Sequence, residues 1–432
     1  MKVCLITHGC AKNLVDSEMI LGLSKDNNIQ IVTKQEEADV IIINTCGFIE
    51  SAKKESLGTI FDVINSKRTD QKLICCGCLS TRYINDLPIE IPEVDRFISI
   101  KDYDHFQDIF NEVVGQKVLT KNIKDCNRLI STQPHTAYVR IGDGCDNRCA
   151  YCAIPLIRGD FVSRTTKEVV EECKWLVAEG YKELVLIAQD TTRFGKENGE
   201  SIEGLLEEIC KIKDLFMVRL LYMYPWDVNE NLINTFKDNP KIAPYFDIPV
   251  QHGSNRILKA MNRRDTKEKI YSLAKLIRDN FKEPIIRTTL IVGFPGETDE
   301  DFNELLQMVK DIKFDRLGVF KYSDEEGTLG YNYDNKIDEE TMDKRYNIVM
   351  ETQAKIAQEL SESKIGNYYD VFIEGYNVEK QMYHGRSFAY APDDVDGCIY
   401  LKKVKKPHIG QIVKVKITDA LIYDLIGEVV ED

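Results

Sequence analysis

The sequence predicts an α/β protein in three successive parts: an N-terminal domain with a parallel sheet, a partial (βα)6 barrel like that of TIM proteins, and a C-terminal antiparallel β-barrel. Three patterns indicate this order. Apolar runs alternate with amphipathic helical stretches in the first third of the chain, the alternation continues with a longer spacing, and only β-type runs follow at the end. The expected domains are residues 1–133, 134–365 and 366–432.

The first part contains short, almost continuous apolar runs, each followed by a helical pattern. The runs are at 2–7, 38–45 and 72–77, and the helical stretches are at 13–23, 50–67 and 104–114. Strands without a polar face are typical of a parallel sheet that helices cover on both sides. We therefore expect such a sheet here.

The second part repeats the strand-and-helix pattern six times. The expected strands are 137–141, 183–188, 217–223, 245–250, 285–293 and 316–322. Six βα units predict a partial barrel, whose working residues lie at the carboxyl ends of the strands.

A long helix over 338–364 and a small barrel complete the chain. Four β-type runs separated by turn residues follow the helix, at 368–376, 397–404, 411–421 and 424–430. Short alternating strands of this kind predict a small antiparallel barrel.

Charge and cysteine content limit the possible functions. The 432 residues carry a formal charge of −14, which argues against general attraction to phosphate backbones or anionic membranes and suits a basic partner. No secretory leader and no membrane-length apolar stretch is seen, so we expect a cytoplasmic protein without membrane association. Thirteen cysteines in a reducing compartment favour metal or redox chemistry over disulfides.

Three cysteines lie close together in "GDGCDNRCAYCAIP": Cys145, Cys149 and Cys152. A structural zinc site would need a fourth local ligand, and the segment contains none. Three thiolates on a 4Fe–4S cluster leave one iron free for a small molecule. A zinc-binding or redox loop remains the alternative.

A second set of cysteines follows three different strands of the N-terminal domain. Cys10, Cys46 and Cys78 each come directly or shortly after an apolar run. The ends of parallel strands meet at one edge of a sheet, so these thiols should converge there. Singly, each is more often a small buried apolar residue, but together they indicate a second cluster.

The C-x3-C-x2-C pattern with Tyr151 before its last cysteine, at the end of the first barrel strand, resembles the radical S-adenosylmethionine (SAM) superfamily. Three thiols ahead of the barrel and a β-domain behind it resemble the methylthiotransferases, over essentially the whole chain. The matching segments are "GCAKNLVDSE", "NTCGFIESAK", "AQDTTRFG", "YSDEEGT" and "APDDVDG". Within that family they are similar to the enzymes that modify an aspartate of small-ribosomal-subunit protein twelve.

The resemblance implies two 4Fe–4S clusters, one held by Cys145, Cys149 and Cys152 and an auxiliary one held by Cys10, Cys46 and Cys78. It implies that one SAM donates a methyl group and a second is the radical source. The radical removes hydrogen from the aspartate β-carbon, and a methylthio group is added there. An external electron donor is implied as well.

The resemblance also places SAM at strand ends and in the cysteine loop. Its implied contacts are Tyr151, Ala153, Gln189, Ser254, Arg287 and Gly293. Arg287 is expected to pair with the methionyl carboxylate, and Ala153 to lie near the adenine. Asp190 and Arg193 are the catalytic candidates, with Arg193 holding the substrate carboxylate.

The C-terminal part resembles a TRAM domain, a fold often used to bind RNA. From residue 366 onward, eleven acidic residues outnumber eight basic ones, whereas an RNA-binding module should be basic. We therefore expect a basic ribosomal protein as partner. A transfer-RNA (adenosine) methylthiotransferase with the same chemistry is the alternative. A non-catalytic iron–sulfur electron carrier or RNA-binding scaffold is a third reading, which leaves the strand-end residues unexplained.

Overall fold

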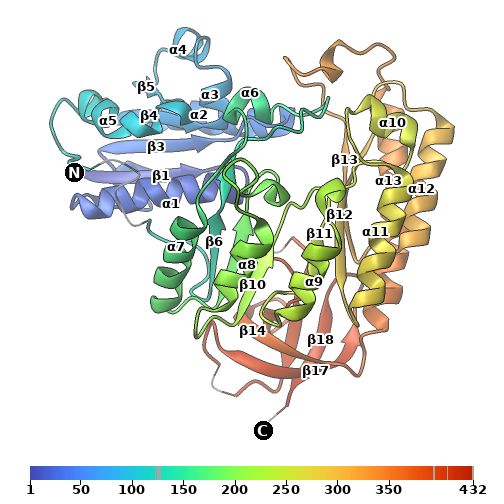
Figure 1. The fold of residues 1–432 in the computed structure, drawn as a ribbon. Helices are drawn as coiled ribbons and strands as arrows, with labels where there is room; N and C mark the ends of the chain where they lie inside the picture. Colours follow the sequence, from blue (N-terminus) through green and yellow to red (C-terminus); the bar gives the residue numbers. More distant parts are fainter. Residues whose placement is uncertain (122, 124–127, 393–394, 406, 431–432) are drawn as a thin grey trace. The chain divides into compact units, whose positions relative to one another are not determined.

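The computed structural model describes residues 1–121, 123, 128–392, 395–405 and 407–430 (Figure 1). The chain forms two compact units. Unit 1 comprises Met1–Ser131, Asp143–Phe161 and Ser323–Tyr331, and unit 2 comprises Thr132–Gly142, Val162–Tyr322 and Asn332–Asp432. The units therefore do not divide simply near residue 133, because two later segments pack with the N-terminal part. Asp393 and Asp394 of "APDDVDG" and the nearby Lys406 lie outside the described residues.

Unit 1 contains the predicted parallel sheet. Its strand order is β2-β1-β3-β4-β5, and every neighbouring pair is parallel. The strands are β1 Lys2–Thr7, β2 Gln30–Ile31, β3 Val40–Thr45, β4 Lys72–Gly77 and β5 Arg96–Phe97. The helices are α1 Ala11–Asp26, α2 Glu50–Ser66, α3 Cys78–Arg82, α4 Leu87–Glu90, α5 Phe106–Val114 and α6 Ile154–Arg158, with 3-10 turns η1 Gln35–Glu37 and η2 Ile100–His105.

Strand β3 shows how the sheet is covered on both faces. All six of its residues are buried. Val40 and Ile42 pack in one core with residues of α1 and α5, whereas Ile41 and Ile43 pack in another with residues of α2 and α3. Successive side chains of a strand point to opposite faces, so a continuous apolar run fills both cores. The structure thus confirms the prediction that helices cover both faces of this parallel sheet.

Unit 2 begins with the predicted six-stranded partial barrel. Two parallel sheets, β10-β9-β6 and β11-β12-β13, are linked by a parallel bridge between Val218 and Ile242. The strands are β6 Thr136–Arg140, β9 Glu183–Ile187, β10 Met217–Leu220, β11 Tyr245–Asp247, β12 Ile285–Val292 and β13 Arg316–Lys321, and all six were predicted.

Helices follow the barrel strands. They are α7 Thr166–Ala178, α8 Ile202–Cys210, α9 Glu230–Asp238, α10 Asn255–Ala260, α11 Lys267–Asn280 and α12 Asp299–Ile312. Shorter elements are β7 Gly142–Asp143, β8 Val162–Ser163, η4 Thr191–Arg193, η5 Pro225–Asp227 and η6 Gly330–Asn332. Capping boxes at Thr165 and Thr298 begin α7 and α12, because each threonine accepts a backbone N–H that the helix leaves unpaired. In the described part of the chain, no helix is long and apolar enough to cross a bilayer.

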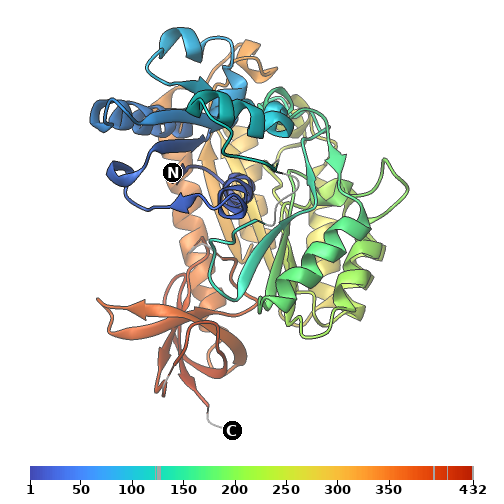
Figure 2. The same ribbon diagram turned by 90° about the vertical axis from the view of Figure 1, so that its left-hand side faces the viewer.

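The long helix α13 Glu339–Glu362 leads into a closed five-stranded barrel (Figure 2). The strands are β14 Tyr368–Asn377, β15 Met382–Arg386, β16 Ile399–Lys402, β17 Ile412–Ala420 and β18 Leu425–Val429, in the order β14-β15-β16-β18-β17. The barrel is not wholly antiparallel, because β16 and β18 run parallel. Strand β15, "MYHGR", was not predicted, since its glycine and polar residues hide the alternation.

A buried ionic network joins this small barrel to the larger one. Glu183, the first residue of β9, accepts hydrogen bonds from Nε of Arg219 at 3.0 Å and from Nη2 of Arg386 at 2.7 Å. Arg386, at the end of β15, also donates to Glu374 at 2.7 Å. Burial alone would raise the pKa of Glu183, but Arg386 and Arg219 outweigh it and bring the pKa to about 2. The two barrels of unit 2 therefore share one set of compensated charges.

We expect Glu183→Gln to lower the free energy of unfolding by about 3 kcal/mol at pH 7, because two buried guanidinium groups lose their counter-charge. The folded-state pKa lies below the unfolded value, so the contribution of Glu183 is complete above about pH 4.3 and is lost as the pH falls toward about 2. Urea unfolding at pH 7 and pH 3 measures this. The difference from wild type should shrink at pH 3, and the exposed Glu179→Gln is the matched control.

Candidate active site

The structure brings the three N-terminal thiols to one edge of the parallel sheet. Cys10 immediately precedes α1, Cys46 follows β3, and Cys78 begins α3 directly after β4. Their strands β1, β3 and β4 are neighbours in the sheet. The convergence expected from the sequence is therefore present.

Glycines beside the cysteines let the chain segments approach closely. Gly9 has φ +94°, and a Cβ there would lie 3.0 Å from both Cβ and Sγ of Cys46. Gly77 has φ +92°, and a Cβ there would lie 2.2 Å from the side-chain oxygen of Asn44. A side chain at either position would be strained and would push the segments apart.

The side chain of Asn13 connects the segments that carry these thiols. Its Nδ2 donates to the carbonyl oxygens of His8 at 3.0 Å and Thr45 at 3.1 Å, next to Cys10 and Cys46. Its Oδ1 accepts from the thiol of Cys78 at 3.3 Å. Asn13 is fully buried, so one carboxamide satisfies groups from all three strand ends. Sequence reasoning missed this residue.

The three thiols influence one another electrostatically. Burial raises the pKa of Cys78 to about 12, and Cys10 and Cys46 add to the rise while Arg158 opposes it. Burial also raises the pKa of Cys46. Cys10 is exposed at the surface of the chain; the protein atoms around its thiol tend to raise its pKa, but Lys12, the backbone N–H of Asn13 and Arg158 outweigh them, so its pKa is lowered. The thiol at the start of α1 is thus the one most readily ionised.

The C-x3-C-x2-C loop lies in the same unit. Gly144 begins it with φ +79°, where a Cβ would lie 2.1 Å from the carbonyl oxygen of Asp160. The amide of Cys152 donates to the carbonyl of Cys149 at 3.0 Å, and the amide of Cys145 donates to that of Gly159 at 3.1 Å. Burial raises the pKa of Cys152, and Cys149 and Cys145 raise it further, as expected for three neighbouring thiols. Unit 1 therefore contains both sets of thiols.

Both sets consist of free cysteines, the ligand type that holds iron–sulfur clusters. In the ranges that the structure describes, no three His, Cys, Asp or Glu side chains converge closely enough to hold one metal ion. A four-iron cluster is larger than an ion, so its thiolate ligands stand farther apart. Neighbouring thiols, with glycines where a Cβ would fill the space, provide such a cradle.

Two further loop residues were predicted to contact SAM. Ala153 is fully buried at the start of α6 and packs with Ile157 and Cys78, so the cysteine loop lies against the other thiol set. Tyr151 is half-buried. Both residues lie in unit 1, and their SAM contacts remain predictions.

Three of the predicted residues follow β9. Gln189 is half-buried, and Asp190 is buried at the start of the turn η4. Asp190 accepts hydrogen bonds from the amide of Thr192 at 3.1 Å and from its hydroxyl. Asp190 thus holds the turn that ends with Arg193.

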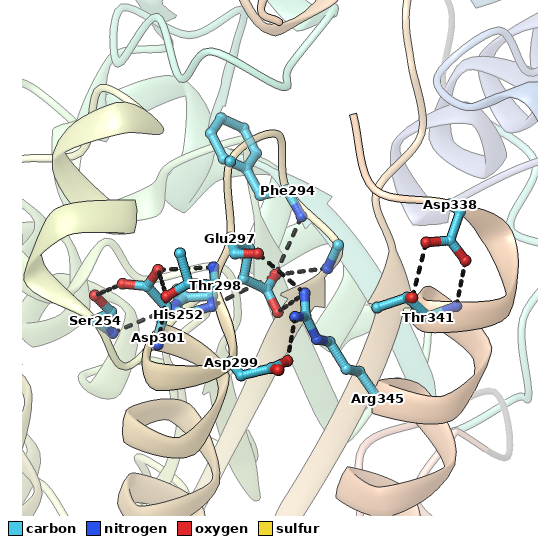
Figure 3. Close-up of polar contacts among 12 residues, drawn as sticks. His252, Ser254, Phe294, Glu297, Thr298, Asp299, Asp301, Asp338, Thr341 and Arg345 are labelled. Atoms are coloured by element: carbon cyan, nitrogen blue, oxygen red, sulfur yellow. Dashed lines mark hydrogen bonds and ion pairs between the residues drawn. The ribbon is translucent and has the colours of Figure 1, made fainter. Parts of the chain in front are cut away.

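Ser254 precedes α10 and is engaged with neighbouring polar groups (Figure 3). Its hydroxyl donates to Oδ1 of Asp301 at 2.6 Å, and its amide donates to Nδ1 of His252 at 3.0 Å. Any contact of Ser254 with a cofactor must share these hydrogen bonds.

Gly293 begins a tight turn at the carboxyl end of β12. Its φ is +77°, and a Cβ there would lie 2.2 Å from Cγ of Met342. Glu297 accepts the amides of Gly293 at 2.6 Å and Phe294 at 3.2 Å, and Nη1 of Arg345 at 3.1 Å (Figure 3). A buried ion pair between Glu297 and Arg345 therefore fixes the turn. The sequence analysis did not identify either residue.

Arg287 lies in a different place from the one predicted. It is the third of eight residues in β12, near the amino end of the strand. Its guanidinium pairs with Asp247 at 2.8 Å and with Asp396 of the small barrel at 3.5 Å. These two carboxylates compensate its charge in this structure, and the contact of Arg287 with the SAM carboxylate stays a prediction.

Sequence comparisons identify families for all three parts. Residues 2–99 match the uncharacterized protein family UPF0004, residues 139–309 the radical SAM superfamily and residues 365–430 the TRAM domain. Proteins named "Ribosomal protein uS12 methylthiotransferase RimO" are 45% identical in Alkaliphilus oremlandii and 44% in Clostridioides difficile, over 99% of each chain. The chain belongs to the RimO methylthiotransferase family.

Solved structures agree with this at the level of fold. The radical SAM methyltransferase TsrM from Kitasatospora setae gives a TM-score of 0.54 at 12% identity and covers 74% of each chain. The cobalamin-dependent SAM radical enzyme OxsB gives 0.53 at 12% identity, covering 81% of this chain and 56% of its own. Membership of the RimO family makes this chain a transferase with SAM and an iron–sulfur cluster as cofactors.

Asn13 provides a test of the site in this RimO-family protein. We expect Asn13→Ala to lower the free energy of unfolding of the cluster-free protein by about 3 kcal/mol, because buried carbonyl groups lose their donors. Urea unfolding measures this, and iron retained after reconstitution should fall as well. The exposed Lys25→Ala on the same helix is the control. Equal stability of the two variants would contradict the role given to Asn13.

Proposed function

We propose that this chain adds a methylthio group to the β-carbon of an aspartate in ribosomal protein uS12, using one SAM as methyl donor and one as radical source. The observation that carries the proposal is the presence of two sets of three thiols in one compact unit. RimO-named relatives at 41–45% identity support uS12 as the substrate.

The two sets of thiols have different tasks in this proposal. Cys145, Cys149 and Cys152 hold the cluster that reduces SAM, and Cys10, Cys46 and Cys78 hold a second cluster. When bound, these cofactors would supply the radical that removes hydrogen from the unactivated C–H bond and the sulfur that is then added to the carbon. A radical is needed because no ordinary base removes that hydrogen.

The protein itself supplies positioning and charge. Asn13 and the adjacent glycines hold the second set of thiols at the sheet edge. In the barrel, Gln189, Ser254 and the turn at Gly293 are the proposed SAM contacts. We assign Arg193 to the substrate carboxylate, with Asp190 holding the turn that presents it.

Charge favours a basic protein over RNA as the substrate. The chain carries a formal charge of −14, which steers a basic ribosomal protein toward it. Lys402, Lys403 and Lys405 form an exposed basic group in the C-terminal barrel, but Lys403 is paired with Glu428 at 2.7 Å. Transfer RNA is therefore the second candidate. The reducing electron comes from an external donor.

The deciding experiment is an anaerobic reconstitution followed by substrate turnover. The protein is loaded with iron and sulfide, the iron is counted, and SAM, a reductant and a peptide with the uS12 aspartate loop are added. We expect about eight irons per chain and a methylthio mass gain on the peptide. Product on transfer RNA alone would favour the second candidate, and about four irons would contradict the second cluster.

The two sets of thiols should separate in mutants. Cys145→Ala should abolish SAM cleavage, since the radical-forming cluster loses a ligand. Cys46→Ala should leave part of the cleavage and stop methylthio transfer. The buried Cys173→Ala is the control, because it lies on α7 outside both sets. Full methylthiolation by the Cys46 variant would contradict its role.

A further inference from the structure

We propose that Arg158 is a positioning residue that sets the reduction potential of the second cluster through its contact with Cys78. This inference rests on the proposed function, because it takes Cys10, Cys46 and Cys78 as ligands of that cluster. Arg158 is the last residue of α6, six positions after Cys152, and its side chain is 1% exposed.

The guanidinium of Arg158 connects the segments of the two thiol sets. Its Nη2 lies 3.7 Å from Sγ of Cys78, 2.9 Å from Oδ1 of Asn13 and 2.8 Å from Oδ2 of Asp16. Its Nη1 donates to Oδ2 of Asp143, two residues before Cys145, at 2.8 Å. One buried cation therefore contacts the start of the C-x3-C-x2-C loop, helix α1 and a thiol of the other set.

The contact with sulfur changes its character when the thiol ionises. The thiol of Cys78 now donates to Asn13 at 3.3 Å. A thiolate that binds iron has no proton to donate, but it accepts a hydrogen bond from Arg158. Hydrogen bonds to the sulfurs and the net charge near a cluster are the main factors that set its potential.

The surroundings make this charge effective. Ala153 and Ile157 are fully buried and pack with Cys78, so little water screens the contact. Two carboxylates, on Asp16 and Asp143, face the one guanidinium. The guanidinium and these two carboxylates together carry a charge of −1, and the carboxylates alone carry −2. A more negative surrounding disfavours the reduced, more negative cluster.

Opposite charge changes distinguish this role from a merely structural one. The first cluster is removed from the full chain by combining Cys145→Ala, Cys149→Ala and Cys152→Ala. This triple variant should retain about four irons per chain, those of the second cluster. In this background, a redox titration followed by EPR gives the potential of the second cluster. Arg158→Gln should shift the potential to more negative values, and Asp16→Asn should shift it to more positive values.

Matched variants complete the test. Arg158→Lys keeps the charge and should give a smaller negative shift than Arg158→Gln. Arg68→Gln removes a cation from the opposite edge of the sheet, just before β4, and should leave the potential unchanged. If Arg158→Gln retains no iron, Asp16→Asn carries the test alone.

The possible failures are distinguishable. Four irons with no shift in Asp16→Asn, or shifts in the same direction for Asp16→Asn and Arg158→Gln, would overturn the role of Arg158. Absence of iron in the triple-cysteine background would instead overturn the second cluster, and with it the proposed function.

Discussion

The arrangement of unit 1 depends on satisfying buried polar backbone at the carboxyl edge of a parallel sheet. The three strand ends that carry the thiols lie side by side there, and each brings carbonyl groups that lose contact with water. The carboxamide of Asn13 resolves this conflict, since it bonds groups next to Cys10 and Cys46 and reaches Cys78. The glycines and the helix starts can then lie close together while the carbonyl groups of His8 and Thr45 keep a hydrogen-bond donor.

A second constraint is that segments far apart in the sequence must pack together in unit 1. The cysteine loop and the segment Ser323–Tyr331 both leave the barrel part of the chain and pack in unit 1. In the latter, the buried carboxylate of Glu325 pairs with Arg82 at 2.6 Å and with Lys53 at 3.1 Å. Arg82 also donates to the carbonyl of Gly47, beside Cys46. The segment "YSDEEGT" is thus explained by charge compensation beside the thiols.

Much of the fold could be predicted because the spacing of apolar residues directly indicates the strands and helices. The apolar runs were enough to predict β3 and the six barrel strands. The rule that parallel strands end at one edge was enough to expect the cysteines after them to lie there. What the sequence did not indicate were contacts between side chains that are far apart along the chain. The pair between Arg287 and Asp396, more than a hundred residues later, could not be expected from the sequence around either residue. Asn13 and Glu325 lie in segments that carried the family resemblance, but their contacts with Arg158 and Arg82 were not evident, because these partners are distant in sequence.

The small C-terminal barrel is less modular than its sequence implies. Arg386 compensates Glu183, and Asp396 accepts from Tyr245 and pairs with Arg287, so residues of both barrels complete each other's buried charges. A domain exchange between relatives that cuts the chain after α13 would separate these partners. Homologous recombination within such a family should therefore succeed only where Glu183, Arg287 and their partners travel together. The two barrels of unit 2 are then inherited as a single unit of selection, whatever each one binds.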